Sequence, residues 1–390
     1  MEVYLVAYLG ILLLVLYNSG KMPINSKIFI AWFISIVLLC GVRDMLGGYD
    51  SYIYGEVFDT VADDITNDVS FFSLSAFYFN PTEPGYAVFN IIIGYITANR
   101  YIYLFITSII IYSCLYHHTK RYCKYPTFAF FILFCMWYFF TFTYLRQVLA
   151  ACIAWFAIPY AIDRKPLRFF LIVALAATFH NSAALFGLLY FIANKRFTKH
   201  QVFIYIILSL LVGLTPVGTV LFGIFGGAMN EHKTSGALAH INSGRVEYIL
   251  EAGFFLALIY YKYKDIAKDK LSICMLNIAL LFMFILTFFV RFPDGGRMSW
   301  YFLIGIAATI SQISVTGFKV HIVKPVTIIV VSALYFRIIF AWGVLLTPYK
   351  TFLTDGVREK DFIWDAYEYD HNYDKDKFYR PVFKFLEADK

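Results

Sequence analysis

Apolar runs close to 20 residues long recur along the whole chain, and they constrain its fold more than any other feature. The runs at 273–290 and 326–346 are two of them. A helix of about 20 apolar residues crosses the hydrocarbon of a bilayer. Of the 390 residues, 60% are hydrophobic and 15% are charged, whereas a soluble domain is usually about a quarter charged. The sequence therefore predicts an all-α, polytopic integral membrane protein.

Cations in the short loops between these runs predict how the chain is threaded. The basic loops lie at 21–27, 120–124, 164–168, 195–199, 262–270 and 319–324. Such loops stay on the cytoplasmic side during insertion. We therefore expect about twelve transmembrane helices (roughly 11–14) in a single domain, 1–347, with both termini outside. The expected spans are 2–18, 28–42, 85–116, 127–144, 147–162, 167–180, 183–194, 202–222, 246–261, 271–290, 298–316 and 325–347.

This threading leaves an outer loop at 43–84, a second outer loop at 223–245 and a C-terminal tail at 348–390 facing outward. The tail is rich in aromatic and charged residues, and it is too aromatic for simple disorder, so we expect it to dock on the outer face. The span 85–116 contains Asn99 and Arg100 and is too long for one upright helix. One long or broken helix, or a re-entrant piece plus a crossing, would account for it.

Residues 167–194 are too short for two full crossings, which predicts a short hairpin. Its tip, 179–182, would then lie below the membrane surface, in a cavity open to the outside. A histidine inside a membrane is expensive in lipid and should face the protein interior. His180 is therefore a candidate for binding a diphosphate oxygen or relaying a proton, with a satisfied structural histidine as the alternative.

The predicted outward segments that precede the tail also hold five arginines. Arginine binds phosphate through a planar fork and stays charged, so several arginines at one outer cavity would form a diphosphate site. We expect Arg43, Arg146 and Arg291 to converge there, joined by Arg245 and Arg297. The alternative is local pairing of each arginine, such as Arg43 with Asp44 or Arg291 with Asp294.

Two carboxylates could activate an acceptor hydroxyl in such a site. Asp50 is our first candidate for the general base, and Glu83 is the second. Asp50 follows the pair Gly47 and Gly48, which gives the backbone freedom to turn N–H groups toward an anion. The alternative for Asp50 is a structural ion pair with Arg43.

Several other classes of function are not supported. The chain shows no nucleic-acid-binding module and no phosphate-binding glycine loop, so its net charge of +7 is explained by insertion and not by nucleic acid. The six cysteines form no CxxC pair, and the histidines lack metal-ligand spacing. We therefore predict no disulfide, no metal and no cofactor.

Several motifs of the chain, taken in order, resemble those of a known family. An outward N-terminus and helix followed by Arg-x4-Gly-x-Asp-x3-Tyr (Arg43, Gly48, Asp50 and Tyr54) is similar to the EpsG-type family of Wzy-like polysaccharide polymerases. Glu83 with Gly85, "LRQ" at 145–147 and "FHNSA" at 179–183 follow in the same order. The motifs cover roughly residues 3–195. Tyr49 departs from the small hydroxyl residue that is more usual there, and the loop 223–245 is shorter than in many polymerases.

The resemblance implies a membrane glycosyltransferase that polymerises oligosaccharide repeat units carried on undecaprenyl diphosphate into O-antigen or exopolysaccharide. It implies a site on the outer face of the bacterial inner membrane, with Tyr54 among the substrate-binding residues. The implied partners are the lipid-linked oligosaccharide, the bilayer, a chain-length regulator and a flippase. Two other classes stay open: a transporter or flippase of lipid-linked oligosaccharide, and a membrane acyltransferase with His180 as the base.

Overall fold

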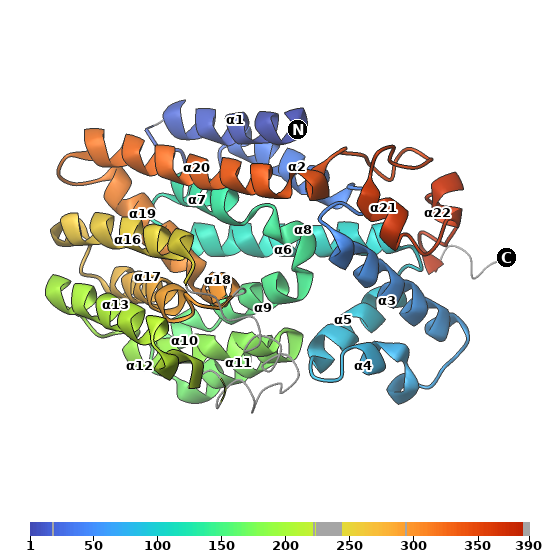
Figure 1. Ribbon diagram of the computed structural model, residues 1–390, viewed down its shortest axis with the longest axis horizontal. Helices are drawn as coiled ribbons and strands as arrows, with labels where there is room; N and C mark the ends of the chain where they lie inside the picture. Colours follow the sequence, from blue (N-terminus) through green and yellow to red (C-terminus); the bar gives the residue numbers. More distant parts are fainter. Residues whose placement is uncertain (18, 221–222, 224–243, 293–294, 385–390) are drawn as a thin grey trace.

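The computed structural model describes residues 1–17, 19–220, 223, 244–292 and 295–384. Within them the chain is helical and forms no β-strand, only a single bridge between Arg43 and Thr351. Most of the longer helices run side by side along the long axis of the molecule (Figure 1). The expected all-α fold is confirmed for the described residues.

Four helical segments are long and apolar enough to cross a membrane: α6 Arg100–Tyr122, α17 Lys270–Phe288, the continuous segment Gly295–Val315 and α20 Val320–Leu346. The segment Gly295–Val315 comprises α18 Gly295–Ser299, η4 Trp300–Phe302 and α19 Leu303–Val315. At about 1.5 Å per residue, helices of this length span a hydrocarbon core. These segments agree with a membrane protein, but twelve crossings are not confirmed because the other apolar helices are shorter. Those that match expected spans include α1 Glu2–Tyr17, α2 Lys27–Gly41, α13 Lys199–Leu214 and α16 Val246–Tyr261.

The long span expected at 85–116 is a broken helix. It consists of α5 Pro84–Gly94 and α6, which begins at Arg100. Asn99 caps α6, with its side-chain oxygen accepting from the Tyr101 and Ile102 N–H groups. The C-terminal tail binds the remaining polar groups of the break: the Ala98 N–H donates to the Pro381 carbonyl at 3.0 Å, and Asn99 Nδ2 donates to the Lys377 carbonyl at 2.8 Å. The break is therefore satisfied by protein, as a break at this position requires.

The next segments consist of short helices, which are α7 Pro126–Trp137, α8 Phe140–Thr143, α9 Leu145–Trp155 and α10 Ile158–Ile162. The short hairpin expected at 167–194 is present. Its first arm is α11 Pro166–Phe179, and its second arm is η2 Asn181–Leu188 followed by α12 Leu189–Ile192. His180 lies at the turn in an extended conformation (φ −157°, ψ 119°), directly after α11 ends.

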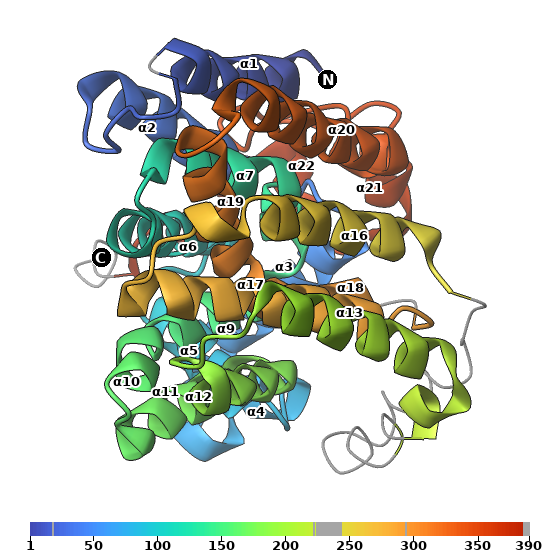
Figure 2. The same ribbon diagram turned by 90° about the vertical axis from the view of Figure 1, so that its left-hand side faces the viewer.

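The centre of the molecule is built on α17 and α19, which pack on each other. Around them, α13 and α16 pack on α17, while α7 and α20 pack on α19. Figure 2 shows the same helices from the side, with α16 between α20 and α17. The short η3, Tyr263–Asp265, follows α16. Apolar residues with buried side chains dominate α17 and α19, as expected for helices surrounded by protein.

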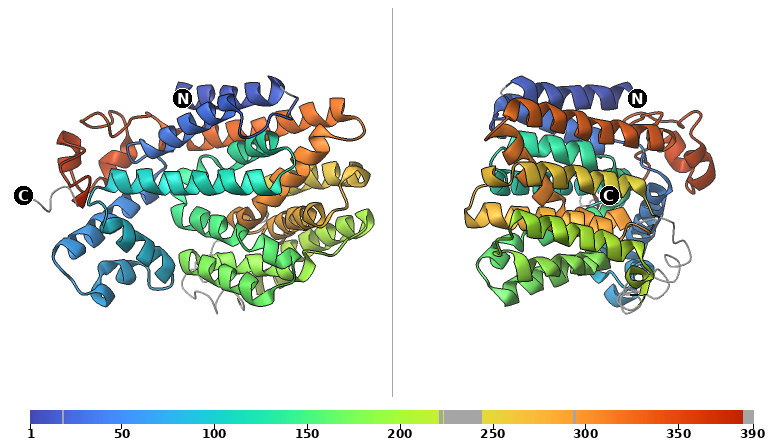
Figure 3. Two further views of the ribbon diagram at one scale, coloured as in Figure 1. Left: turned by 180° about the vertical axis from the view of Figure 1, so that it is seen from behind. Right: turned by 60° about the vertical axis from the view of Figure 1, so that its left-hand side comes forward.

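A small helical unit lies at one end of the bundle. It contains α3 Tyr49–Thr66, η1 Phe71–Ser73, α4 Ser75–Phe79 and α5, together with tail helices α21 Phe362–Tyr367 and α22 Asn372–Lys375. Figure 3 shows this unit from behind, beside the end of α6. The expected outer loop 43–84 therefore has a fold of its own. The second expected outer loop, 223–245, lies almost entirely outside the described residues.

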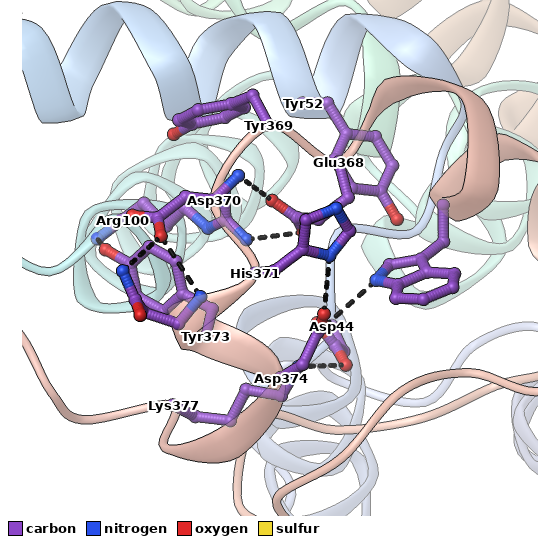
Figure 4. A network of polar contacts seen from close by, with 12 residues as sticks. Asp44, Tyr52, Arg100, Glu368, Tyr369, Asp370, His371, Tyr373, Asp374 and Lys377 are labelled. Atoms are coloured by element: carbon purple, nitrogen blue, oxygen red, sulfur yellow. Dashed lines mark hydrogen bonds and ion pairs between the residues drawn. The ribbon is translucent and has the colours of Figure 1, made fainter.

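Buried ion pairs hold the tail on the start of α6 and on the turn before α3 (Figure 4). Arg100 Nη2 lies 2.7 Å from Glu368 Oε2, and both side chains are at most 2% exposed. Lys377 Nζ lies 3.1 Å from Asp44 Oδ2, whose carboxylate also accepts from the Tyr101 hydroxyl at 2.7 Å. Asp44 thus pairs with the tail rather than with Arg43. A charged side chain that is buried without such a partner destabilises the fold. The tail is therefore part of the folded core.

Candidate functional site

The start of α3 places Asp50 and Tyr54 at the end of the bundle. Gly47 and Gly48 have φ of 120° and 100°, which L-residues with a side chain rarely adopt. A Cβ at Gly47 would also lie 2.9 Å from the Phe142 Cβ. The Gly47 N–H donates to the Leu345 carbonyl at 3.1 Å, so it serves the fold. Asp50 and Tyr54, one turn apart, share a face of α3.

Glu83 and Arg146 form an ion pair beside this face. Glu83 is the residue directly before α5, and Arg146 lies in the first turn of α9. Glu83 Oε2 and Arg146 Nη1 are 2.6 Å apart. The Glu83 side chain is 2% exposed, but that of Arg146 is 30% exposed. The guanidinium carbon of Arg146 lies 5.9 Å from the centre of the Tyr54 ring and 6.0 Å from that of Tyr86. Buried Glu83 Oε1 and Arg146 Nε have no hydrogen-bond partner among the described residues, so this pair retains polar atoms for a ligand.

Asp50 lies within the electrostatic reach of two arginines. Burial raises the pKa of its carboxyl above the ordinary value, although the charges of Arg146 and Arg297 favour the ionised form. A half-buried carboxylate with a raised pKa accepts a proton more readily than an exposed aspartate does. The geometry therefore suits a general base next to cations.

His180 belongs to a second polar group that adjoins the first. Its Nδ1 lies 2.7 Å from the Ser182 hydroxyl oxygen and 3.2 Å from that of Tyr301, and the two hydroxyl oxygens are 2.8 Å apart. The charges of Glu83 and Arg297 both act on Tyr301. The histidine at the hairpin turn thus lies near the ion pair of Glu83 and Arg146, although the two are far apart in sequence.

Arg297 connects this region to a cavity of about 270 Å³. Its guanidinium carbon lies 4.7 Å from the centre of the Tyr144 ring, and Gln147 Nε2 donates to its carbonyl at 2.7 Å. Arg245 lines the same cavity and lies 3.6 Å from Glu247 Oε1. Two of the five predicted arginines, Arg245 and Arg297, therefore share one cavity.

The structure places Arg43 differently from the other predicted arginines. Its side chain is fully buried, and it donates to the carbonyls of Cys40, Leu46 and Phe142 and to the Ser108 hydroxyl. The guanidinium thus holds the turn that leads into α3. Arg291 follows α17 and is half-buried; its role as a diphosphate ligand stays a prediction.

Sequence reasoning missed three charged residues that line the cavity, which are Glu247 and Glu251 of α16 and Arg337 of α20. The signal was present, because each is a charge within an apolar run that was expected to span the membrane. No group of three or more potential metal ligands occurs within the part of the chain that the structure describes.

Comparison with known proteins identifies the family. The sequence model of the EpsG family matches residues 26–351, well over half of the chain and far beyond the motifs singled out above. Searches of characterised proteins and of solved structures gave no significant match. Because the family match covers most of the helical bundle and the candidate site, the chain belongs to the EpsG family of exopolysaccharide or Wzy-like polymerases.

Proposed function

We propose that this protein polymerises oligosaccharide repeat units linked to undecaprenyl diphosphate, at the outer face of a bacterial inner membrane. The family supports a membrane polysaccharide polymerase of the glycosyltransferase type. One observation carries the finer proposal. Asp50, Glu83, Arg146 and Arg297, which come from four separate segments, interact within one region. This arrangement combines a candidate base with cations suited to a diphosphate.

In the proposed reaction, a sugar hydroxyl of one repeat unit attacks the anomeric carbon of the growing chain. The new glycosidic bond forms as the bond from that carbon to the diphosphate oxygen breaks, and the lipid diphosphate leaves with the electron pair. Asp50 takes the proton of the attacking hydroxyl. Arg146 and Arg297 neutralise the charge that grows on the leaving diphosphate.

The remaining predicted residues take supporting roles in this proposal. Glu83 fixes the Arg146 side chain through the 2.6 Å ion pair, and Tyr54 supplies an aromatic surface beside it for a sugar. His180 donates to a diphosphate oxygen or relays the acceptor proton. Arg43 orders the turn before α3 and does not contact substrate, because its guanidinium is buried on backbone carbonyls.

Profiling of surface polysaccharide in a deletion strain tests the function. We expect long chains to disappear while single repeat units remain on the carrier or the surface. Loss of every surface unit would instead indicate a flippase, and unchanged chain lengths with altered acylation would indicate an acyltransferase.

Complementation with single variants tests the site. Arg146→Lys keeps a positive charge but loses the planar fork, and we expect polymer synthesis to fall about tenfold or more. Arg168→Lys is the matched control, because Arg168 is exposed and lies away from the site, on α11. Equal polymer from both variants at equal protein abundance would contradict a diphosphate site at Arg146.

A further inference from the structure

The cavity that contains Arg297 lies between α16 and α20. Its lining includes Glu251 from α16, Arg337 and Trp342 from α20, and Trp300. α16 packs mainly on α13, α17 and α19, whereas α20 packs on α7 and α19. The two helices lie on the same side of the molecule (Figures 1 and 2). The cavity is therefore bounded by two helices held mainly by other partners.

α20 is a peripheral helix, which places the cavity next to lipid. Only 28% of its most apolar 18-residue stretch is buried inside the protein, compared with 89% for the segment that contains α19. In a membrane, the uncovered surface of α20 faces acyl chains. The cavity is therefore lined on one side by a helix that contacts lipid.

Arg337 is an unusual residue for that position. It lies nine residues before the end of α20 at Leu346, which corresponds to a depth of about 14 Å along the helix. Its side chain is exposed and forms no hydrogen bond or close ion pair within the described part of the chain. The charge of Arg337 acts on Glu251 of the facing helix. A charge at this depth is expensive unless it faces an opposite charge or a polar ligand.

The walls around these charges are aromatic. The ring of Trp300 stacks on Phe140 with centroids 4.4 Å apart, and Trp342 meets Phe140 edge to face at 5.1 Å. Flat aromatic side chains offer large apolar surfaces, which suit contact with an isoprenoid chain. Arg245 and Arg297 also line this cavity, and the charge of Arg297 acts on Asp50. The lining of the cavity therefore includes residues of the lipid-facing helix α20 and Arg297 of the candidate site.

We propose that the groove between α16 and α20 is the lateral route by which an isoprenoid lipid diphosphate moves from the bilayer to the site. Arg337 binds the diphosphate first, and Arg297 receives it at the end of the groove. Glu251 balances the charge of Arg337 when no lipid is bound and competes with the incoming phosphate. This inference rests on the proposed function for the identity of the lipid, but its test does not require polymer synthesis.

Binding to the purified full-length protein tests the charges, with undecaprenyl diphosphate that carries no sugar as the ligand. Arg337→Met should weaken binding about tenfold or more, as for the loss of one charge-assisted contact. Glu251→Gln should tighten binding, because it removes a competing anion. A misfolded variant cannot bind more tightly, so the second result separates the proposal from a folding defect. Unchanged affinity in both variants would overturn it.

Photocrosslinking tests the route. p-Benzoylphenylalanine in place of Trp342 should label the bound undecaprenyl diphosphate, whereas the same group in place of Phe340 should not do so specifically. Phe340 is on the same helix but is 82% exposed and does not line the cavity. Excess undecaprenyl diphosphate should abolish labelling at 342, and excess phosphatidylglycerol should not. Equal labelling at both positions, or equal competition by phosphatidylglycerol, would mean that the groove holds bulk lipid and would overturn the proposal.

The two proposals can fail separately. Specific labelling at 342 by a protein that makes no polymer would leave the lipid route standing and remove the polymerase function. Polymer synthesis without specific labelling at 342 would do the reverse.

Discussion

Asp59 should make the docking of the C-terminal tail depend on pH. Its carboxylate is 2% exposed and accepts hydrogen bonds from the hydroxyls of Tyr369 and Tyr373. Burial raises the pKa of the Asp59 carboxyl from 3.8 to about 6, although the charges of Arg100 and Arg380 favour its ionised form. The docked state therefore binds a proton more tightly than the undocked state does.

The direction and size of the effect follow from linkage. Because the pKa in the docked state is raised, the stabilisation from protonated Asp59 is fully present below pH 3.8 and is lost as the pH rises through about 6. A rise from 3.8 to about 6 corresponds to about 3 kcal/mol between the two limits. Between pH 5 and pH 7 the same two values predict a roughly tenfold increase in the opening constant of the tail.

Limited proteolysis of the purified protein measures this opening. The rate of cleavage within 348–384 tracks the open population when reclosing is fast, and an unstructured peptide substrate corrects for the pH dependence of the protease. Asp59→Asn should remove most of the tenfold change. Asp63→Asn should keep it, because Asp63 lies one turn away with a side chain that is 56% exposed. The same ratio of rates in wild type and Asp59→Asn would refute the reasoning.

Three further substitutions separate scaffold from site. Arg43→Ala should destabilise the fold by about 3 kcal/mol or more, because it leaves buried carbonyls without a hydrogen-bond donor. The loss of folded protein would appear as loss of the monodisperse peak in size-exclusion chromatography, and a normal peak would contradict a structural role. Asp50→Asn should leave that peak intact but reduce polymerisation about 100-fold or more. Because the pKa of Asp50 is raised, wild-type activity should fall on acidification at a higher pH than for an ordinary aspartate, and a variant with normal chain lengths would exclude the base role. His180→Gln should abolish polymer if the imidazole relays protons, and normal polymer with a flat pH profile would make it structural.

The positions of the helices could be predicted because each apolar run carries its own signal. The expected spans at 2–18, 28–42 and 246–261 agree closely with α1, α2 and α16. The broken helix at 85–116 was also predictable, since Asn99 and Arg100 interrupt the run. The number of crossings was not, because apolar composition does not distinguish a short buried helix from a membrane-spanning one.

The tail contacts could not be predicted from local patterns. Arg100 and Glu368 are 268 residues apart in the sequence. Asn99 and Lys377 are 278 residues apart. A sequence shows that buried charges need partners but not which partners they find. For the same reason the sequence offered Arg43, the neighbour of Asp44, as its alternative partner, whereas Asp44 pairs with Lys377.

What distinguishes the arginines of this protein is the kind of acceptor that each one meets. Arg43 and Arg100 are fully buried, and their guanidinium groups bind carbonyls or Glu368 within the fold. Arg146 keeps 30% of its side chain exposed, and Arg337 lies exposed beside a charged cavity. Arg43 itself is thus a scaffold residue for the turn that leads into α3, the helix that carries Asp50 and Tyr54. An arginine-to-lysine series should therefore divide into two sets: Arg43 and Arg100 variants that lose folded protein, and Arg146 and Arg337 variants that keep it and lose lipid diphosphate binding.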